Sequence, residues 1–282
     1  MAQFPEEQSE DGSFQRQEDA FRQWVTTDGS SGFPAEEGRY HLYVSLACPW
    51  AHRTLIVREL LGLQPAVGVT VADPVRDEKG WAFREGPGHG RDKANGFEYL
   101  AEAYEISQPG FKGRITVPVL WDMERGMIVN NSEDDICRMF AEAFRPFHRH
   151  TLPELFPPAL AEEQKALSEH IYEKVNNGVY AAGFASTQSA YEKAALDLFE
   201  ALNGLEKRLS SSPFLLGNDL VETDWRLFCT LIRFDAVYHG HFKCNVQQIR
   251  DYPQLSSYLR HLYQLPGIAS TVNFEHIKRH YY

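Results

Sequence analysis

The stretch RYHLYVSLACPWAHRTLIVRELLGL, residues 39–63, decides the fold. The apolar side chains of residues 40–46 alternate, which is typical of a strand with one buried face. RTLIVRELLGL then has the spacing of a helix, and Gly62 lies where that helix would end. The segment AVGVTVAD, residues 66–73, has the composition of a second strand. The order strand, helix, strand favours two parallel strands joined by a helical crossover.

The rest of the chain divides into a mixed part and a helical part. Two more strands are expected at residues 116–122 and 127–131, and a helix is expected to begin at Ser132, where acidic residues crowd the first turn. Residues 74–113 are rich in glycine, proline and charge and are expected to be irregular. The sequence does not decide whether this segment covers the site as a lid. Strand patterns nearly vanish after residue 158. Helices are expected there near residues 159–177, 188–209, 223–238 and 251–264.

These expectations give a fold class and a set of domain boundaries. The sequence predicts an α/β thioredoxin-like N-terminal domain followed by an all-α C-terminal helix bundle. The N-terminal half has the size of a thioredoxin-like domain. The expected parts are an N-terminal tail and lead-in (1–38), the thioredoxin-like domain (39–144), a proline-rich linker (145–158) and the all-helical domain (159–282).

Composition argues against several classes of function. The formal net charge is −11 and no long basic run is present, so nucleic-acid binding is not expected. No stretch approaches the roughly 18 consecutive apolar residues of a membrane span, and the acidic, polar start resembles neither a secretory signal nor a transit peptide. The four cysteines lack the pairing of a metal site and are too few for a disulfide scaffold. We therefore expect a cytoplasmic protein without a metal.

One cysteine lies where its sulfur would be reactive. Cys48 follows the first strand, and Pro49 fits the first turn of the next helix, where a missing N–H costs nothing. The helix dipole and the backbone N–H groups at that end favour a thiolate, and Arg53 is expected to add positive potential. A dithiol reductase would have a second cysteine three residues after Cys48 to resolve a disulfide formed there, but Ala51 stands at that position. We therefore expect an external thiol, of which glutathione is the abundant one in a reducing cytoplasm; the alternative is a buried structural cysteine.

Two further motifs fit a bound tripeptide. In TVPV, Pro118 interrupts a strand, and thioredoxin-like domains place a cis-proline at this point beside the reactive sulfur. Val117 would then offer its backbone N–H and C=O to glutathione, whereas a trans-proline on an edge strand is the alternative. In NNSEDDI, the helix N-terminus at Ser132 suits the glutamyl carboxylate of glutathione, and an acidic side chain suits its ammonium group. Simple helix capping by Ser132 is the alternative there.

Taken together, the motifs resemble a known family. RYHLYVSLACPWAHRTLIVRELLGL, GWAF, GRITVPVLWD, IVNN, NNGVYAAGFA, RFDAVYHGHFKCN and PGIASTVNFEHIKRHYY are similar to segments of the glutathionyl-hydroquinone reductases, the Xi-class (omega-like) glutathione transferases. The resemblance covers about residues 14–282 and implies the glutathione transferase fold, a homodimer, and glutathione as co-substrate. It also implies the reaction: Cys48 attacks the sulfur of a glutathionyl-hydroquinone, the hydroquinone leaves, and a second glutathione resolves the mixed disulfide.

The same resemblance implies further site residues. Tyr180 in NNGVYAAGF and Tyr281 in KRHYY match positions of the family's aromatic pocket. A phenol there hydrogen-bonds substrate hydroxyls and helps to protonate the leaving ring carbon. Trp81 in GWAF and Arg114 in GRITVP match positions that contact glutathione, and Arg114 would give the anionic tripeptide a fork-shaped cation.

Two positions depart from the family pattern. The family reads NNES where this chain reads NNSE, so Ser132 and Glu133 are exchanged relative to the expected glutamyl-binding pair. A shift by one position on a helix rotates a side chain by about 100°, so the two residues cannot both reproduce the usual contacts. In LVETDW, Val221 replaces the Ser or Thr that would cap the next helix, and Thr223 is expected to take over that role.

Two alternatives to the reductase are kept. The same Cys48 suits a broad glutathione thioltransferase with dehydroascorbate-reductase activity. The exchange of Ser132 and Glu133 suits a non-catalytic module that binds glutathione or another ligand. The expected partners are thus glutathione and aromatic (hydro)quinone conjugates, and neither a nucleic acid nor a membrane.

Overall fold

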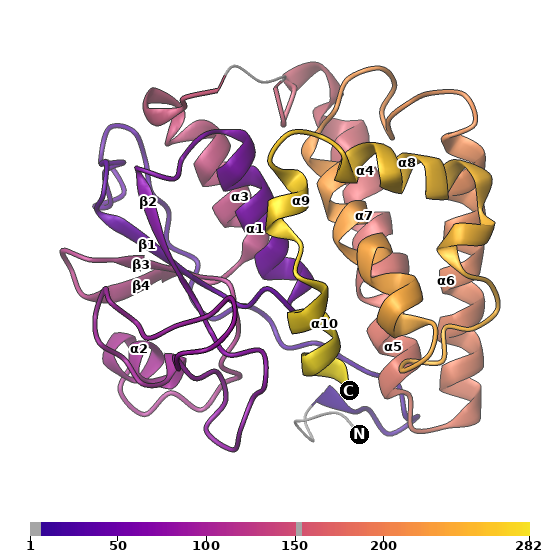
Figure 1. Ribbon diagram of the computed structural model, residues 1–282, viewed down its shortest axis with the longest axis horizontal. Helices are drawn as coiled ribbons and strands as arrows, with labels where there is room; N and C mark the ends of the chain where they lie inside the picture. Colours follow the sequence, from indigo (N-terminus) through magenta and orange to yellow (C-terminus); the bar gives the residue numbers. More distant parts are fainter. Residues whose placement is uncertain (1–6, 151–153) are drawn as a thin grey trace. The chain divides into compact units, whose positions relative to one another are not determined.

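The computed structural model describes residues 7–150 and 154–282 (Figure 1). Residues 1–6 of the expected N-terminal tail and residues 151–153 of the expected linker lie outside the described residues. By their internal contacts the described residues form two compact units, one built on a β-sheet and one built of helices.

The segments of each unit are not continuous in the sequence. The first unit, called the thioredoxin-like unit, contains residues 18–150 and 267–280. The second, called the helical unit, contains residues 7–17 and 154–266 together with Tyr281 and Tyr282. The domain boundaries expected from the sequence stay a prediction, and the contacts add a C-terminal segment to the first unit.

The sheet of the thioredoxin-like unit has four strands in the order β2-β1-β3-β4. The strands are β1 (Tyr40–Val44), β2 (Val67–Val71), β3 (Val119–Asp122) and β4 (Met127–Asn130). β1 and β2 are parallel, whereas β3 is antiparallel to both β1 and β4. The four expected strands and the parallel pair are therefore confirmed.

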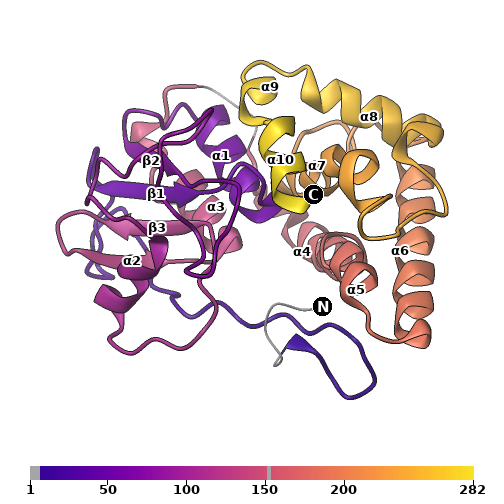
Figure 2. The same ribbon diagram turned by 60° about the horizontal axis from the view of Figure 1, so that its bottom comes forward.

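The helices of this unit follow from the same patterns. They are α1 (Pro49–Leu60), α2 (Leu100–Ser107), α3 (Glu133–Glu142), the 3₁₀ turn η2 (Arg145–Phe147), α9 (Ile268–Thr271) and α10 (Phe274–Tyr281), of which only the last residue belongs to the helical unit. Helices α1 and α3 were both expected and lie side by side (Figures 1 and 2). Helix α2 packs against β4, and α9 packs against α1.

Helix α2 corrects the expectation that residues 74–113 are irregular throughout. Leu100, Ala103 and Tyr104 are buried with the spacing of one helix face. The helix also has an N-terminal cap, because the side chain of Glu102 accepts the backbone N–H of Tyr99 at 2.8 Å. The helical spacing of these residues is present in the sequence but short, and it lies within a segment rich in glycine and proline.

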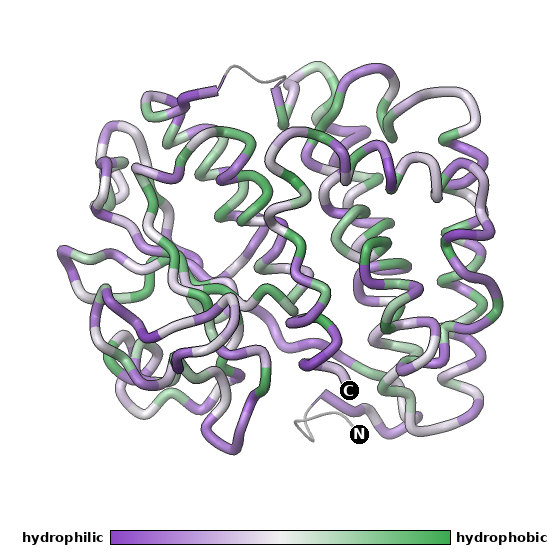
Figure 3. The backbone as a smooth tube through the Cα atoms, viewed as in Figure 1, coloured by the Kyte–Doolittle hydropathy of each residue, from purple (hydrophilic) through white to green (hydrophobic). Residues whose placement is uncertain are grey.

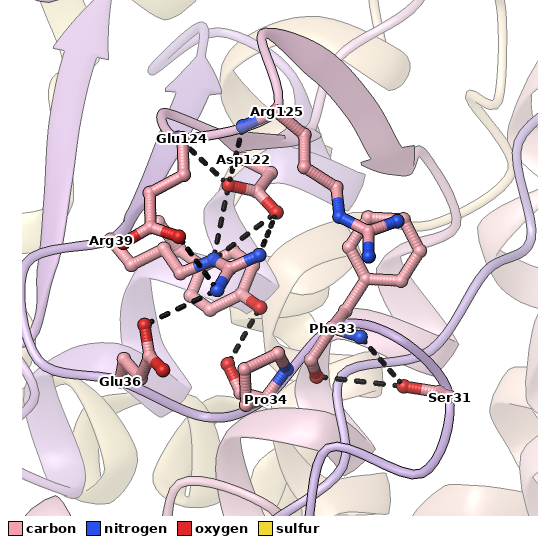
Figure 4. Close-up of polar contacts among 9 residues, drawn as sticks. Ser31, Phe33, Pro34, Glu36, Arg39, Asp122, Glu124 and Arg125 are labelled. Carbon is pink, nitrogen blue, oxygen red and sulfur yellow. Dashed lines mark hydrogen bonds and ion pairs between the residues drawn. The ribbon is translucent and has the colours of Figure 1, made fainter.

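A buried ion pair joins the first and third strands (Figure 4). Arg39 precedes β1 and donates from Nη2 to Oδ2 of Asp122 at 2.7 Å and from Nε to Oδ1 at 3.1 Å. Asp122 is fully buried and accepts the backbone N–H groups of Glu124 and Arg125, at 2.9 and 3.2 Å, in the turn between β3 and β4. The carboxylates of Glu36 and Glu124 flank the same guanidinium. The pair fixes β1 against β3 at one end, and the other end of β1 leads to α1.

The described residues of the helical unit form helices and short helical turns. Its elements are η3 (Pro158–Leu160), α4 (Ala161–Ile171), η4 (Tyr172–Asn176), α5 (Gly178–Phe184), α6 (Gln188–Arg208), α7 (Glu222–Arg233), η5 (Phe234–Tyr238), η6 (Ile249–Asp251) and α8 (Pro253–Tyr263). All four expected helical segments are confirmed, and α5 is an additional helix. Helix α7 is buried along nearly its whole length, and Figure 3 shows hydrophobic residues along it.

Two elements of this unit, η4 and η5, are π-helical turns. In such a turn a backbone N–H bonds the carbonyl five residues earlier. The N–H of Asn177 donates to the carbonyl of Tyr172 at 2.8 Å, and the N–H of His239 donates to the carbonyl of Phe234 at 2.9 Å. The first turn leads into α5, and the second continues α7.

Within residues 7–150 and 154–282, no helix has the length and apolar character that crossing a membrane requires. The same residues contain no group of three or more His, Cys, Asp or Glu side chains arranged to hold a metal ion.

Candidate functional site

Cys48 lies between β1 and α1, as the sequence predicts. Its backbone is extended (φ −75°, ψ 122°) at the N-cap of α1, and Pro49 is the first residue of the helix. Its side chain is partly exposed, whereas Cys137, Cys229 and Cys244 are buried. Burial raises the pKa of the Cys244 thiol to about 12, which keeps that thiol protonated at neutral pH. Cys48 is thus the cysteine that combines exposure with a place at a helix N-terminus.

The peptide bond between Val117 and Pro118 lies beside this sulfur. The bond is cis, and Sγ of Cys48 donates to the carbonyl oxygen of Val117 at 3.5 Å. The preceding loop is held by Tyr104, whose hydroxyl donates to the carbonyl of Thr116 at 3.0 Å and accepts the N–H of Thr116 at 3.2 Å. The cis bond predicted from TVPV and its place beside Cys48 are confirmed.

The N-terminus of α3 directs two acidic residues at α1. Glu133 is buried, and its Oε1 lies 3.1 Å from Nη2 of Arg53. Asp134 contacts the same nitrogen. Because Arg53 is a buried residue of α1 that is paired with two carboxylates, the positive potential expected from it near the thiol is offset.

Ser132 occupies the N-cap of α3, but its side chain makes no capping hydrogen bond. Its hydroxyl is hydrogen-bonded to the carboxyl group of Asp19, and its N–H donates to Oδ1 of Asn130 at 2.7 Å. Burial raises the pKa of Asp19 to about 6, against the opposing effects of the Arg22 charge and the hydrogen bond from Ser132. Asp19 could not be identified from the sequence, because it is one acidic residue within an acidic, polar N-terminal segment.

Trp81 and Arg114 belong to the thioredoxin-like unit. Trp81 is buried, and its indole stacks on the imidazole of His280 with centroids 5.2 Å apart and an interplanar angle of 16°. The guanidinium carbon of Arg76 lies 5.0 Å from the centroid of the same indole. Arg114 is partly exposed in the loop that precedes Val117. His280 and Arg76 were not identified from the sequence, since both reach Trp81 from distant or irregular segments.

Three phenols meet in the helical unit and are called the tyrosine cluster: Tyr180 of α5, Tyr238 of η5 and Tyr281 at the end of α10. The hydroxyl of Tyr180 lies 2.6 Å from that of Tyr281 and 3.5 Å from that of Tyr238. The rings of Phe184 and Phe242 pack against Tyr180, with centroids 5.9 and 5.1 Å away. Burial raises the pKa values of Tyr238 and Tyr281 well above the ordinary value, so both stay protonated at neutral pH. The two tyrosines selected from the sequence thus contact each other, and Tyr238 is a third that was missed.

Comparisons with known proteins cover both units. Residues 47–143 match the family model "Glutathione S-transferase, N-terminal domain", and residues 188–261 match "Glutathione S-transferase, C-terminal domain". Glutathionyl-hydroquinone reductase YqjG of Escherichia coli is 49% identical over 278 residues, which cover 96% of this chain and 84% of the relative. Glutathionyl-hydroquinone reductase PcpF of Sphingobium chlorophenolicum is 43% identical over 275 residues, which cover 97% of this chain and 86% of the relative.

Solved structures resemble the chain equally closely. The glutathione-bound structure of YqjG from Escherichia coli has a TM-score of 0.91 at 49% identity, covering 93% of this chain and 87% of that one. The glutathione-S-transferase Xi from Phanerochaete chrysosporium has a TM-score of 0.93 at 47% identity, covering 97% of this chain and 89% of that one. The chain therefore belongs to the glutathione S-transferase family, in the group of the Xi-class transferases and glutathionyl-hydroquinone reductases.

Proposed function

We propose that this chain is a glutathione-dependent reductase that removes glutathione from glutathionyl-hydroquinones. The observation that carries the proposal is Cys48, which is partly exposed at the N-terminus of α1 with its sulfur 3.5 Å from the carbonyl of Val117. The relatives YqjG and PcpF are named for this activity. Ala51 stands where a dithiol enzyme would have its second cysteine, so a thiol from outside must regenerate Cys48.

The proposed reaction has two steps. The Cys48 thiolate attacks the sulfur of the conjugate and forms an S–S bond, while the bond between sulfur and ring carbon breaks. The electron pair of that bond stays on the ring carbon, which takes up a proton, and the hydroquinone leaves. The thiolate of a second glutathione then attacks the glutathione sulfur of the mixed disulfide. Glutathione disulfide leaves and the Cys48 thiolate is restored, so the ring carbon is reduced while two glutathione sulfurs are oxidised.

We propose that the thioredoxin-like unit binds the glutathione moiety. The backbone of Val117, ahead of the cis bond to Pro118, would pair with the tripeptide as an added strand does. The α3 N-terminus at Ser132 would hold the glutamyl carboxylate. The remaining residues proposed to contact glutathione are Trp81, Arg114 and Glu133.

For the aromatic ring we propose hydrogen bonds from Tyr180 and Tyr281. Their hydroxyls lie 2.6 Å apart, and the raised pKa of Tyr281 keeps that phenol a donor at neutral pH. A neutral phenol donates to a hydroquinone oxygen and stabilises the charge that develops when the C–S bond breaks. Proton delivery to the ring carbon would follow from the same contact.

The proposal is tested by turnover of glutathionyl-menadiol with glutathione. Cys48→Ser and Cys48→Ala are expected to abolish it, whereas Cys229→Ala, at a buried cysteine of α7, is expected to retain it. Mass spectrometry of the wild-type chain treated with the conjugate alone should show one added glutathione, about 305 Da, on Cys48. Turnover that survives the loss of the Cys48 sulfur would refute the mechanism.

The alternatives predict different results in the same assay. A broad thioltransferase would reduce dehydroascorbate or a small mixed disulfide faster than the conjugate, and a non-catalytic module would bind glutathione without forming the adduct. We further propose a homodimer in the cytoplasm, which light scattering of the purified chain and cell fractionation would test.

A further inference from the structure

Helix α10 holds a loop of the thioredoxin-like unit at both of its ends. The loop is residues 74–87, called the clasped loop, and α10 presents His276 and His280 to it, four residues apart and therefore on one helix face. Nδ1 of His280 donates to the carbonyl oxygen of Pro74 at 2.7 Å, and Nε2 of His276 donates to that of Pro87 at 2.6 Å. The donors are the imidazole nitrogens, because a carbonyl oxygen can only accept. The clasped loop is thus tied to α10 where it begins and where it ends.

The loop backbone and α10 approach closely at the second of these ties. His276 is fully buried. Gly88 directly follows the clasped loop with a φ of 77°, and a Cβ there would lie 3.0 Å from Nε2 of His276 and from Nδ2 of Asn273. The hydrogen bond from His276 therefore depends on a backbone that carries no side chain at this point.

Trp81 lies near the middle of the clasped loop, and backbone hydrogen bonds fix its place. Its carbonyl oxygen accepts the N–H of Leu100 at 2.9 Å, and the carbonyl oxygen of Ala82 accepts the N–H of Asp73 at 2.8 Å. These bonds join the loop to the start of α2 and to the residues after β2. They set the position of the Trp81 backbone but not the direction of its side chain.

The direction of the indole follows from its contact with His280. The two rings are stacked, with centroids 5.2 Å apart and an interplanar angle of 16°. Because Nδ1 of the same imidazole donates to Pro74, the ring that supports the indole is itself fixed. Trp81 is only 5% exposed, but its indole N–H makes no hydrogen bond within the described residues and, unlike those of Trp121 and Trp225, is not fully enclosed. The stack therefore holds a donor that a ligand can use.

We propose that His280 is a positioning residue that holds the Trp81 indole in the direction from which it contacts glutathione. This inference rests on the part of the proposed function in which Trp81 contacts glutathione. His280 acts through the indole and does not touch the tripeptide, and His276 supports it by anchoring the other end of the clasped loop. Helix α10 thus contributes to how tightly the thioredoxin-like unit binds glutathione.

The physical reason is the entropy lost when a side chain is ordered on binding. An indole that rotates freely must be fixed when glutathione binds, and this weakens binding. His280 fixes the rotamer before the ligand arrives. The guanidinium carbon of Arg76 also lies 5.0 Å from the indole centroid, so part of the support comes from the loop itself and the effect of losing His280 is moderate. The effect falls on binding and not on the bond-breaking step, so KM for glutathione changes while kcat at saturation does not.

The test is the dissociation constant of glutathione, measured by calorimetry under reducing conditions on the full chain. His280→Ala removes both the stacked ring and the hydrogen bond and should raise the constant about five- to tenfold. His280→Phe keeps a ring and His280→Asn keeps a donor at the place of Nδ1, so each should recover part of the loss. The matched control is His261→Ala in the helical unit, which removes a histidine with its centroid 5.7 Å from that of Phe214 and should change the constant by less than about twofold.

A double-mutant cycle shows whether His280 acts through Trp81. Trp81→Phe removes the indole N–H and should itself weaken binding, and His280→Ala should then add less than about twofold. In NMR spectra, the indole N–H signal that Trp81→Phe lacks should shift when glutathione is added to the wild-type chain. His280→Ala should move the same signal before any ligand is added.

Several outcomes would overturn the inference. They are a change of less than about twofold in His280→Ala, a full additive loss in the double variant, an equal loss in His261→Ala, and a Trp81 signal that glutathione does not shift. The calorimetric stoichiometry distinguishes unfolded molecules from weakened binding. Binding that depends on His280, in a chain that does not turn over glutathionyl-menadiol, would refute the proposed reductase and leave this inference standing. A wild-type chain that does not bind glutathione would refute both.

Discussion

Removal of the Asp122 carboxylate should destabilise the thioredoxin-like unit strongly. Asp122→Ala eliminates three hydrogen bonds from the Arg39 guanidinium, at 2.7, 3.1 and 3.2 Å, and two from the backbone N–H groups of the β3–β4 turn. The side chain of Asp122 is fully buried, and that of Arg39 is 8% exposed, so water replaces little of this interaction. Hydrogen bonds to Asp122 raise the pKa of Arg39, and without them the ordinary pKa of arginine is still high enough to keep the guanidinium charged in the variant.

The expected decrease in the free energy of unfolding depends on which groups remain around the Arg39 guanidinium. Truncating one partner of a buried ion pair costs roughly 3–5 kcal/mol, because a buried charge is left behind. Glu36 and Glu124, with Oε2 atoms 3.2 and 2.9 Å from Nη1 of Arg39, retain part of the compensation. We therefore expect the lower end, about 3 kcal/mol of unfolding free energy. At about 2–4 °C per kcal/mol, Tm should fall by roughly 6–12 °C.

Urea unfolding followed by tryptophan fluorescence measures this difference. The matched control is Glu142→Gln, which breaks the exposed pair of Arg138 and Glu142, 2.8 Å apart with both side chains about half exposed, and should cost less than about 0.5 kcal/mol. Reductase activity per folded molecule should persist at low temperature, because Asp122 lies at the end of β1 away from α1. A loss below about 1 kcal/mol, or no larger than that of the control, would refute the reasoning.

Three further changes have expected outcomes. The pKa of Asp19 is about 6 in the folded chain and 3.8 in its reference state, so the folded chain binds more protons between these values and Asp19 makes stability fall as pH rises from about 4 to 6. In urea titrations, the stability of Asp19→Asn should therefore increase relative to wild type across that range. A pH-independent difference between the two proteins would contradict this. Glu206→Ala in α6 should cost about 1–2 kcal/mol of unfolding free energy, since its carboxylate accepts two backbone N–H groups at 2.8 Å in the first turn of α8. Glu200→Ala, at an exposed position also in α6, should change stability by less than about 0.5 kcal/mol. Gly88→Ala should lower Tm more than Gly96→Ala; both glycines have positive φ (77° and 78°), but only at Gly88 would the added Cβ meet side-chain nitrogens, at 3.0 Å.

The strands and long helices could be predicted because their signals are local. The alternation in residues 40–46 and the helical spacing after Cys48 identify β1 and α1 without reference to the rest of the chain. Helices α2, α5, α9 and α10 were missed because each has only 4 to 8 residues, too few for a period of 3.6 to be distinct. The grouping of residues 267–280 with the thioredoxin-like unit depends on long-range packing, which no local pattern contains.

The candidate site likewise contains residues that local patterns identify and residues that depend on long-range contacts. Cys48 and the cis-proline were predictable because residue type and neighbouring elements together specify the chemistry. The partners of the α3 N-terminus were not, since Asp19 and Arg53 approach it from segments about 80 to 110 residues away. The cap of α7 shows the same limit: Thr223 does not replace the missing cap, because its hydroxyl bonds Ser168 at 2.8 Å, and Asp224 accepts the N–H of Val221 at 2.9 Å instead.

The two π-helical turns have a consequence for how this chain tolerates changes in length. Each holds one residue more per turn than an α-helix, and that extra residue rotates everything after it by about 100°. Tyr238 ends one such insertion and Tyr180 follows the other. Deleting Ala236 would let the backbone close into a regular helix and swing the next phenol by more than a quarter turn. The aim of these phenols is set by residue count, and a single deletion upstream of either would act like a mutation of the tyrosine itself.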